Sequence, residues 1–515
     1  MSKILISKIA LFLLLATTTL FAQTAPRVLT SADYDRAVKM LAFNTNQMVD
    51  RSGVRPTWLP DGRFYYQVLS STGKEFVLVN PLDGSRTVKA SMNDLGVAAE
   101  KTQNAKPNEI ISPDGKKVAY IKDFNLWMRE LSNGKEMQLT VDGVENFGYA
   151  TDNAGWTHSD RAILRWSPDS KKIATFQQDE RAVSDMYLVS TNIGAPKLQK
   201  WKYPLPGEPI ITIQRVIIET ETPRVIRLQM PPDPRRSTLC DDISCDGGFS
   251  DTEWTADSSR LAFVSTSRDH KQANLRVADA DTGAVREIYE ERAATQYESG
   301  QGGINWRYLP ATNEFIWYSE KDDWGHLYLF GMDGRLKNQI TKGNFVVTQI
   351  VKVDDKNRVI YFNANGREAG RDPYFSHFYS IGFDGRNLKL LSPEDGNHQI
   401  TLSPDGKYFV DAFSKPDVPP TTVLRDMTGK QISVVEKTDV SRLTSAGWKP
   451  PAPITVKDRN NKWDLYGLMF TPSNLDATKK YPVVNYIYPG PQAGGVGSRS
   501  FSAGRSDHQA LAELG

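Results

Sequence analysis

The sequence predicts an all-β propeller followed by the beginning of an α/β domain. One observation is a recurring unit of strand, tight turn and strand, clearest at residues 165–189. A second is the turn itself, in which Ser, Pro, Asp and then Ser or Gly follow one another, because proline presets the turn dihedral and aspartate accepts backbone hydrogen bonds. A third is a change of composition near residue 450, where a proline-rich linker precedes a continuous apolar run.

Seven copies of this unit can be counted along the chain. A repeat of roughly 45–55 residues, built from short strands and hairpin turns, is typical of a β-propeller, whose blades must stack to bury their faces. One interval is nearly double the others, and residues 215–230 read as strands without the turn motif. We therefore expect eight blades within residues 52–440, one of them degenerate, with seven blades as the alternative. The copies begin at Trp58, Ser112, Trp166, Trp254, Tyr308, Asp354 and Ser403.

Composition narrows the class of protein. The 515 residues exceed one ordinary domain, so two or three domains are expected. The 63 basic and 61 acidic residues leave a net charge of +2, and no basic stripe appears. We expect no nucleic-acid partner.

Residues 1–22 read as a secretory signal peptide. Lys3 and Lys8 give a positive start, residues 9–15 form a short apolar core, and residues 20–22 provide a small-residue cleavage site. The apolar run is short for a spanning helix, and an uncleaved N-terminal anchor is the alternative. No other stretch is apolar enough to cross a membrane, so we expect a periplasmic or secreted protein.

The two cysteines, Cys240 and Cys245, lie in a loop rich in proline and glycine. In an oxidising compartment they can form a local disulfide, and two free thiols are the alternative. A metal site would need further ligands nearby, and the surrounding sequence offers none.

An amphipathic helix precedes the propeller. Ser31 is a good N-cap, and Tyr34, Ala37, Val38 and Leu41 fall on one apolar stripe. This stripe requires a partner surface elsewhere in the protein.

The α/β domain is expected to begin after a rigid linker at residues 448–453. Residues 454–458 and 465–470 read as a hairpin. Residues 480–488 form a continuous apolar run, typical of a strand buried on both faces of a parallel sheet. A helix begins near Ser506. The roughly 60 residues after the linker are too few to close such a domain.

These segments, taken in order, resemble the dipeptidyl peptidase IV branch of the prolyl oligopeptidase serine peptidases. The resemblance implies a propeller that caps an α/β-hydrolase domain, with residues 23–51 packing on that domain and residues 453–515 forming its start. It also implies an exported exopeptidase that cuts short peptides after Pro or Ala and can form a homodimer. The similar segments are residues 33–37, 319–329, 366–374, 447–451 and 465–491.

The resemblance further implies a Ser-His-Asp triad, in which histidine deprotonates serine and aspartate orients histidine. By its place in the Tyr-x-Gly-Pro motif, Tyr488 would stabilise the tetrahedral oxyanion. An ordinary strand-end aromatic is the alternative role for Tyr488. No metal or organic cofactor is expected, since triad chemistry needs none.

Two departures from the family pattern matter. The chain has no Gly-x-Ser-x-Gly elbow, and Ser498, Ser500 and Ser502 lie in a Gly/Ser loop instead. None of the six histidines lies where the family's catalytic one would be. We expect this chain to lack all three triad residues and to be a fragment of a longer protein, with a natural truncation as the alternative.

The second departure concerns the paired glutamates with which the family binds the free amino terminus of its substrate. Only Glu145 and Asp152 remain in the corresponding region. Asp152 could substitute for the pair, or it could cap a turn. The charged residues 179–181 could face the cavity or form a surface ion pair.

Two other functions stay open. One is an acylaminoacyl peptidase or oligopeptidase without a strict requirement for a free amine, which the missing glutamates allow. The other is a stand-alone propeller that binds proteins or peptides. The apolar strand after residue 480 argues against the binding module, because such a module would leave it exposed.

Overall fold

The computed structural model describes residues 28–97, 105–151, 159–234, 244–245, 248–298, 304–487 and 497–515. The predicted signal peptide at residues 1–22 lies outside these ranges. So do Cys240 and the side chain of Cys245. Within the described ranges, no helix is both long and apolar enough to span a membrane.

Seven antiparallel sheets of four or five strands dominate the described residues. Sheet 1 contains β1 (Thr57–Trp58), β2 (Phe64–Ser70), β3 (Gly73–Val79) and β4 (Arg86–Lys89). Sheet 2 contains β5 (Ile110–Ile111), β6 (Lys117–Lys122), β7 (Asn125–Glu130) and β8 (Glu136–Gln138). Sheet 3 contains β9 (Arg165–Trp166), β10 (Lys172–Asp179), β13 (Thr212–Glu219), β14 (Arg224–Arg227) and β15 (Asp233–Pro234). Sheet 4 contains β18 (Thr252–Trp254), β19 (Arg260–Thr266), β20 (Gln272–Asp279) and β21 (Val285–Arg292).

The other three sheets repeat the four-stranded pattern. Sheet 5 contains β22 (Arg307–Leu309), β23 (Glu314–Ser319), β24 (His326–Gly331) and β25 (Leu336–Gln339). Sheet 6 contains β26 (Val346–Asp354), β27 (Val359–Asn365), β28 (Ser376–Gly382) and β29 (Lys389–Leu390). Sheet 7 contains β30 (Asn397–Leu402), β31 (Tyr408–Lys415), β32 (Val418–Asp426) and β33 (Gln431–Lys437).

Short helices and hairpins complete the described elements. The helices are α2 (Ser31–Lys39), α3 (Ala42–Thr45), η1 (Asn46–Met48), η2 (Asn93–Leu95), η3 (Pro310–Thr312), α4 (Ser441–Ser445), η4 (Arg505–Asp507) and α5 (His508–Ala512). The hairpins are β11 (Asp185–Ser190) with β12 (Lys197–Lys202), β16 (Ser244–Cys245) with β17 (Gly248–Phe249), and β34 (Ala452–Lys457) with β35 (Asp464–Met469).

The turn motif forms the tight turn that the sequence predicts. In the copy after β9, the Ser167 hydroxyl donates to Asp169 Oδ1 at 2.6 Å and accepts the backbone N–H of Lys172 at 2.8 Å. Ser170 takes the left-handed conformation (φ 61°) at the position where other copies have glycine. These contacts close the hairpin between the first and second strand of the sheet.

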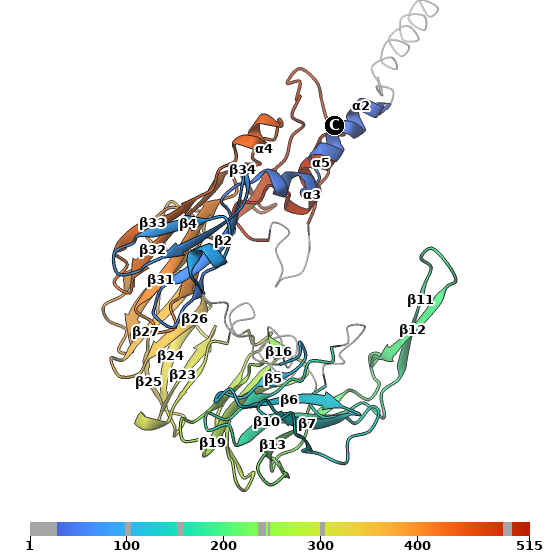
Figure 1. The fold of residues 1–515 in the computed structure, drawn as a ribbon, viewed down its shortest axis with the longest axis vertical. Coiled ribbons are helices and arrows are strands. Elements are labelled where there is room, and N and C mark those ends of the chain that lie inside the picture. Colours follow the sequence, from blue (N-terminus) through green and yellow to red (C-terminus); the bar gives the residue numbers. More distant parts are fainter. Residues whose placement is uncertain are drawn as a thin grey trace, which may run out of the picture.

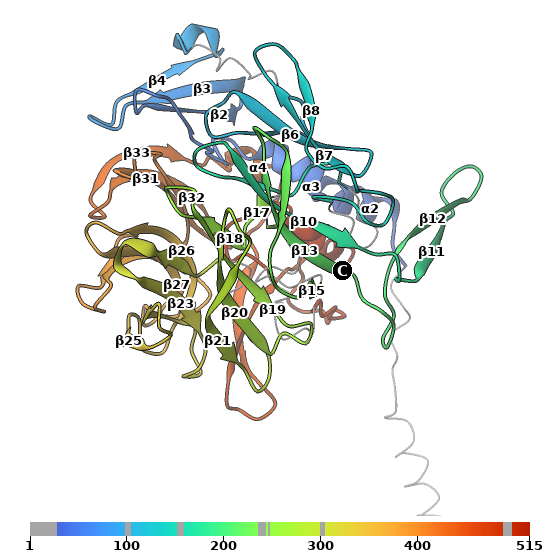
Figure 2. The same ribbon diagram turned by 90° about the horizontal axis from the view of Figure 1, so that it is seen from below.

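The prediction that residues 215–230 form a separate degenerate blade is wrong. β13 pairs with β10 along the whole length of both strands, and β14 pairs with β13, so these residues complete sheet 3. The long interval in the sequence arises because the hairpin β11–β12 is inserted between β10 and β13. This hairpin projects from the body as an arm in both views (Figures 1 and 2).

The sheets are arranged in an arc that is open between sheet 1 and sheet 2. Buried apolar clusters join sheet 2 to 3, 3 to 4, 4 to 5, 5 to 6, 6 to 7, and 7 to 1. Within the described ranges, no buried cluster joins sheet 1 to sheet 2. Figure 1 shows the two sheets apart, with β2 and β4 beside sheet 7 and β6 and β7 beside sheet 3.

Both faces at this opening are covered or polar. On sheet 1, Leu78 packs under Leu95 and Val97 from the segment that follows β4. On sheet 2, the ammonium of Lys122 lies 4.5 Å from the centre of the Trp127 ring. Polar outer faces are typical of the terminal units of stacked repeat arrays.

The two ends of the described chain pack together beside sheet 7. Met40, Leu443, Trp448 and Ala510 belong to one buried cluster there, and α2 contacts α5. The predicted hairpin at 454–470 forms as β34–β35. The buried strand predicted at residues 480–488 is not observed: residues 481–487 have no regular structure, and Val483 is 93% exposed, because no described strand pairs with this segment.

Candidate functional site

The functional candidates lie at one end of the strands, where turns and connectors gather. Because antiparallel strands alternate in direction, the turn from second to third strand and the connector into the next sheet lie at the same end of every sheet. We call this end the connector face. The segment after residue 497 docks there: Arg499 Nε lies 2.8 Å from Asp372 Oδ2, and Phe501 N–H donates to Ser414 Oγ at 3.0 Å.

Arg36 of α2 ties the amino-terminal helix to this second part of the chain. Its Nε lies 3.1 Å from Glu513 Oε2, and its Nη2 donates to the backbone oxygen of Glu513 at 2.8 Å. Glu513 also accepts hydrogen bonds from the backbone N–H and the hydroxyl of Ser473. The helix, the linker region and the final helix are therefore one packed unit above the connector face.

One of the two carboxylates predicted to bind an amine lies within the described residues. Glu145 is exposed in a turn on the connector face of sheet 2, and Asp152 lies outside the described residues. The turn is fixed by its neighbours, since the backbone oxygen of Asn146 accepts the N–H of Glu180 at 2.9 Å.

Glu180 is the middle residue of the charged segment 179–181, for which the sequence leaves open either a position facing the cavity or a surface ion pair. It follows β10 and is 5% exposed, and it accepts a hydrogen bond from the side chain of Gln178. Glu180 thus places a buried carboxyl group beside the Glu145 turn. The sequence contains a signal for this position. The alternation of side chains along β10, continued to the next residue, places Gln178 and Glu180 on the same face of the strand.

Asp179 and Arg181, on either side of Glu180, form an ion pair with each other. This ion pair is one of the two arrangements expected for residues 179–181. Arg181 Nη2 lies 2.8 Å from Asp179 Oδ2, and the hydrogen bond from Arg181 lowers the pKa of Asp179. The guanidinium also lies 3.9 Å from the centre of the Phe147 ring. The Arg181 side chain is exposed, and the Asp179 side chain is partly exposed.

Tyr488, the predicted oxyanion stabiliser, lies outside the described residues. The three serines of the Gly/Ser loop have local partners: Ser498 Oγ accepts the N–H of Ser500, Ser500 Oγ accepts Asn397 Nδ2, and Ser502 Oγ accepts the N–H of Arg505. None of these three hydroxyls bonds to a histidine within the part of the chain that the structure describes. They are not arranged as nucleophiles.

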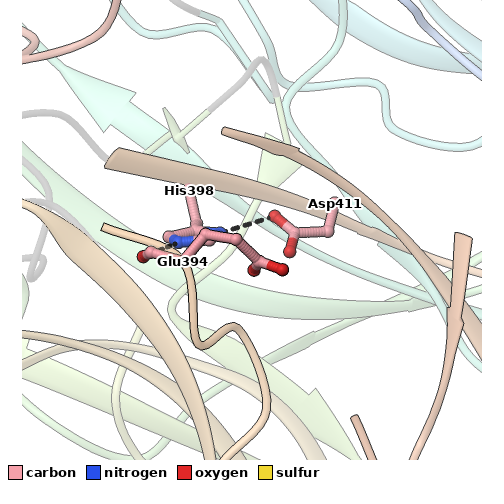
Figure 3. A group of neighbouring side chains, drawn as sticks. All are labelled: Glu394, His398 and Asp411. Atoms are coloured by element: carbon pink, nitrogen blue, oxygen red, sulfur yellow. Dashed lines mark hydrogen bonds and ion pairs between the residues drawn. The ribbon is translucent and has the colours of Figure 1, made fainter. Parts of the chain in front are cut away.

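A buried cluster between sheets 6 and 7 offers the types of ligand that a metal ion uses. Glu394, His398 and Asp411 each place one potential ligand atom within 4.8 Å of the others (Figure 3). However, His398 Nδ1 lies 2.7 Å from Asp411 Oδ1, and Nε2 lies 2.9 Å from the backbone oxygen of Glu394. The guanidinium of Arg425 pairs with both carboxylates.

These contacts do not fit a metal site. A histidine ligand needs a lone pair directed at the metal, whereas both ring nitrogens of His398 already face oxygen atoms of the protein. The positive charge of Arg425 occupies the carboxylates that would hold the ion. The cluster is an ion network that joins the last strands of the arc.

His377 lies beside this network, with its ring centre 4.9 Å from that of His398. Its Nδ1 faces the backbone oxygen of Ser392 at 3.2 Å, and its Nε2 faces Arg371 Nη1 at 3.4 Å. Burial and the charge of His398 lower the pKa of His377 to about 4. His377 is therefore neutral, with Nδ1 as donor and Nε2 as acceptor.

A cavity of about 350 Å³ separates the amino-terminal segment, sheet 7 and residues 500–503. Its walls include Asn46, Gln399, Ser414 and Thr422, and none of its lining side chains is titratable. The cavity can offer hydrogen bonds but no acid or base. It marks the junction of the propeller and the second part of the chain.

A family model for the dipeptidyl peptidase IV N-terminal region matches residues 61–420. Curated relatives include a probable dipeptidyl-aminopeptidase B of Neosartorya fischeri, 24% identical over 434 residues, which are 76% of this chain and 45% of that protein. Dipeptidyl-aminopeptidase B of Aspergillus niger is 23% identical over 451 residues, 78% of this chain and 47% of that protein. The chain thus spans just under half the length of these relatives.

Solved structures support the same fold. A putative dipeptidyl aminopeptidase IV from Bacteroides ovatus matches with a TM-score of 0.65 and 23% identity, over 87% of this chain and 62% of that one. Dipeptidyl peptidase 4 from Porphyromonas gingivalis matches with a TM-score of 0.66 and 18% identity, over 86% of this chain and 68% of that one.

Proposed function

The chain belongs to the dipeptidyl peptidase IV family of the prolyl oligopeptidase group, and from this premise we propose that the full-length protein is an exported serine exopeptidase. It releases dipeptides from peptide amino termini after Pro or Ala. The observation that carries the proposal is the family match over residues 61–420. The two fungal relatives, which are named as dipeptidyl-aminopeptidases, agree with it.

In the proposed mechanism, the triad lies in the rest of the hydrolase domain and not in this chain. Serine attacks the carbonyl of the second residue, histidine takes its proton and passes it to the leaving amine, and aspartate orients histidine. Tyr488 donates its hydroxyl proton in a hydrogen bond to the oxyanion. The connector face supplies the wall opposite the triad, since the start of the second domain docks there.

The substrate's ammonium group has to be bound without the paired glutamates. Glu180 supports this role because it is a buried carboxylate beside the Glu145 turn. A charge-assisted hydrogen bond from an ammonium to such a carboxylate is among the stronger polar contacts in proteins. Glu145 and Asp152 are the further candidates.

The test uses the full-length protein and chromogenic Ala-Pro and Gly-Pro amides, each with a free or an acetylated amino terminus. We expect hydrolysis of the free-amine substrates alone. Hydrolysis of both forms at equal rates would support the acylaminoacyl peptidase or oligopeptidase alternative. No hydrolysis, together with retained binding of peptides, would support the stand-alone binding propeller.

Three finer points belong to the same proposal. We place the mature protein in the periplasm or outside the cell, on the signal-like residues 1–22, and secretion of a tagged full-length chain tests this. We infer a seven-bladed open propeller, which fits the seven sheets.

We also infer a homodimer through the arm β11–β12, because Tyr187, Leu198 and Ile193 are exposed there. Light scattering of the wild type and of Ile193→Asp tests the homodimer.

A further inference from the structure

A cavity of about 600 Å³ lies at the open end of the arc, outside the residues assigned so far. It is formed by the connector that leads into β5, the end of β6, the turn after β6, and the connector that leaves sheet 2. Tyr120 and Lys122 line this cavity, so it lies against the broad face of sheet 2 that borders the opening between sheets 1 and 2. Turns and connectors of this kind lie on the connector face, the same face on which the segment after residue 497 docks.

The turn after β6 presents an aromatic ring at this cavity. Asp123 and Phe124 have φ values of 49° and 63°, the left-handed pair of a type I′ hairpin turn, where Asn and Gly are preferred. A bulky side chain is strained in this conformation. The Phe124 side chain is 41% exposed, so core packing does not account for it. Such strained residues cluster at ligand-binding sites.

Part of the charge around the cavity is neutralised by ion pairs. Glu109 pairs with Arg129 at 2.5 Å, and Lys122 lies 3.7 Å from Glu136. Lys106 also attracts Glu136. Arg129 and Lys122 are therefore engaged with carboxylates of sheet 2 and its leading connector, whereas Lys106 lines the cavity without an ion pair to any described residue.

Two carboxylates at the cavity stay without a cation. Asp123 and Asp160 are both exposed, and neither has an ion pair in the described part of the chain. Together with the exposed Phe124 ring, they form an aromatic and acidic surface. Guanidinium and ammonium groups bind such surfaces through ring contact and ion pairing.

We propose that this cavity is an exosite that binds an arginine or lysine side chain of the peptide substrate, downstream of the cleaved bond. The proposal rests on the proposed peptidase function. The cavity shares the connector face with the second domain, so a peptide held by its amino terminus at the catalytic site can extend across this face to the cavity. The exosite gives the enzyme a preference for basic residues in the part of the peptide that remains after cleavage.

The test uses the full-length protein and quenched fluorescent peptides with a free amino terminus and Pro at the second position. Arginine is placed in turn at the third to eighth positions, and the matched peptide has citrulline, which has the same shape without the charge. We expect arginine to raise kcat/KM by about three- to tenfold at one or two neighbouring positions. An Ala-Pro chromogenic amide is too short to reach the cavity and serves as the reference substrate.

Two variants test the residues. Phe124→Gly removes the ring and suits the left-handed turn, so the hairpin is retained. Asp160→Asn removes one charge without changing the shape. Both variants should lose most of the arginine preference and cleave the Ala-Pro amide at the wild-type rate. The matched control is Glu221→Gln, an exposed carboxylate at the opposite end of sheet 3, which should keep the preference.

Equal rates for the arginine and citrulline peptides, or a preference retained in Phe124→Gly, would overturn the exosite. If the wild-type protein cleaves none of these substrates, the proposed function fails, and the exosite is tested by binding. The fluorescence anisotropy of labelled arginine and citrulline peptides should then differ several-fold in Kd. Equal Kd values, or a difference that survives in Phe124→Gly, would overturn it.

Discussion

Arg36 in α2 and Glu513 at the end of α5 form an ion pair between segments 477 residues apart, with Nε 3.1 Å from Oε2. The Glu513 side chain is fully buried, and its other hydrogen bonds come from Ser473 and Gln509. A buried carboxylate of this kind needs its cation, because its desolvation is offset only by the charge of Arg36 and the surrounding donors. The amino-terminal helix is thus part of the second domain's packing.

The first prediction is that Arg36→Met lowers the free energy of unfolding by about 1–3 kcal/mol, since it leaves Glu513 buried without a cation. The range is below that of a fully buried pair because Arg36 is 24% exposed. Urea unfolding followed by tryptophan fluorescence measures it. Arg335→Met, at a side chain that is 88% exposed, is the control and should change the value by less than about 0.5 kcal/mol. Equal losses in both variants would contradict the prediction.

The second prediction concerns Arg215, which joins sheets 3 and 4. Its guanidinium lies 2.8 Å from Asp233 and 2.6 Å from Asp251, and all three side chains are buried. Arg215→Met leaves Asp251 buried without a cation and Asp233 with only the more distant Arg276, 3.8 Å away, and should destabilise the protein by about 3–5 kcal/mol. The measurement is the urea midpoint.

Its control is Arg224→Met in the next strand of the same sheet. Arg224 pairs with Glu219 at 2.7 Å, but its side chain is 55% exposed. That pair should contribute little to stability, because water and salt screen the charges of an exposed ion pair. A loss in Arg215→Met no larger than in Arg224→Met would show that the buried pair does not hold the two sheets together.

The repeat and its turns could be predicted from the sequence because they depend on neighbouring residues. The contacts of Ser167 and Asp169 lie within five residues and leave a local signature. The pairing of β13 with β10 could not be predicted, because residues 184–203 separate the two strands as an arm. A long interval in the sequence is equally compatible with an extra blade and with an insertion.

The opening between sheets 1 and 2 was not predicted for a similar reason. Closure depends on whether two distant faces meet, and Leu78 and Trp127 read as ordinary blade residues. The candidate site was predicted in part. Glu145 was named for its sequence position, and Glu180 was named only as part of the charged segment 179–181. That Glu180 is the buried carboxylate could not be predicted, because burial depends on packing between distant segments. The exposure of the Phe124 ring could not be predicted, because it depends on a left-handed turn for which the residue pair Asp-Phe is not a recognised signal.

The third prediction separates two effects at Ser170. Its left-handed backbone favours glycine, while its hydroxyl accepts the backbone N–H of Asp114 at 3.1 Å and so joins sheet 2 to sheet 3. Ser170→Ala keeps the strain and loses the bond, so we expect a loss of about 1–2 kcal/mol. Ser170→Gly relieves the strain as it loses the bond, so the two effects nearly cancel, to within about 0.5 kcal/mol.

Thermal unfolding of the two variants measures this difference. Ser258 provides an internal repeat of the experiment, since it has φ 60° and its hydroxyl accepts the N–H of Asp169 at 3.2 Å. Equal destabilisation by alanine and glycine at both positions would mean that the strain is negligible.

The last prediction concerns pH. His377 is 2% exposed and faces Arg371, Glu368 and His398. Its pKa is about 4 in the folded protein and near 6.5 when unfolded. Below pH 6.5 the unfolded chain therefore binds a proton that the folded protein does not. Stability should fall as the pH decreases from 6.5 to 4, by about 3 kcal/mol at most.

Replacing His377 by Gln should flatten this part of the profile, although it lowers stability at pH 8 by removing a buried ring. Urea midpoints at half-unit steps from pH 8 to pH 4.5 give the slope. The same substitution at His270, in the partly exposed turn after β19, is the control and should keep the wild-type slope. A His377→Gln profile parallel to that of the wild type would mean that other groups cause the acid sensitivity. A flatter profile would show that the neutral ring of His377, held beside the His398–Asp411–Arg425 network, limits the stability of sheets 6 and 7 in acid.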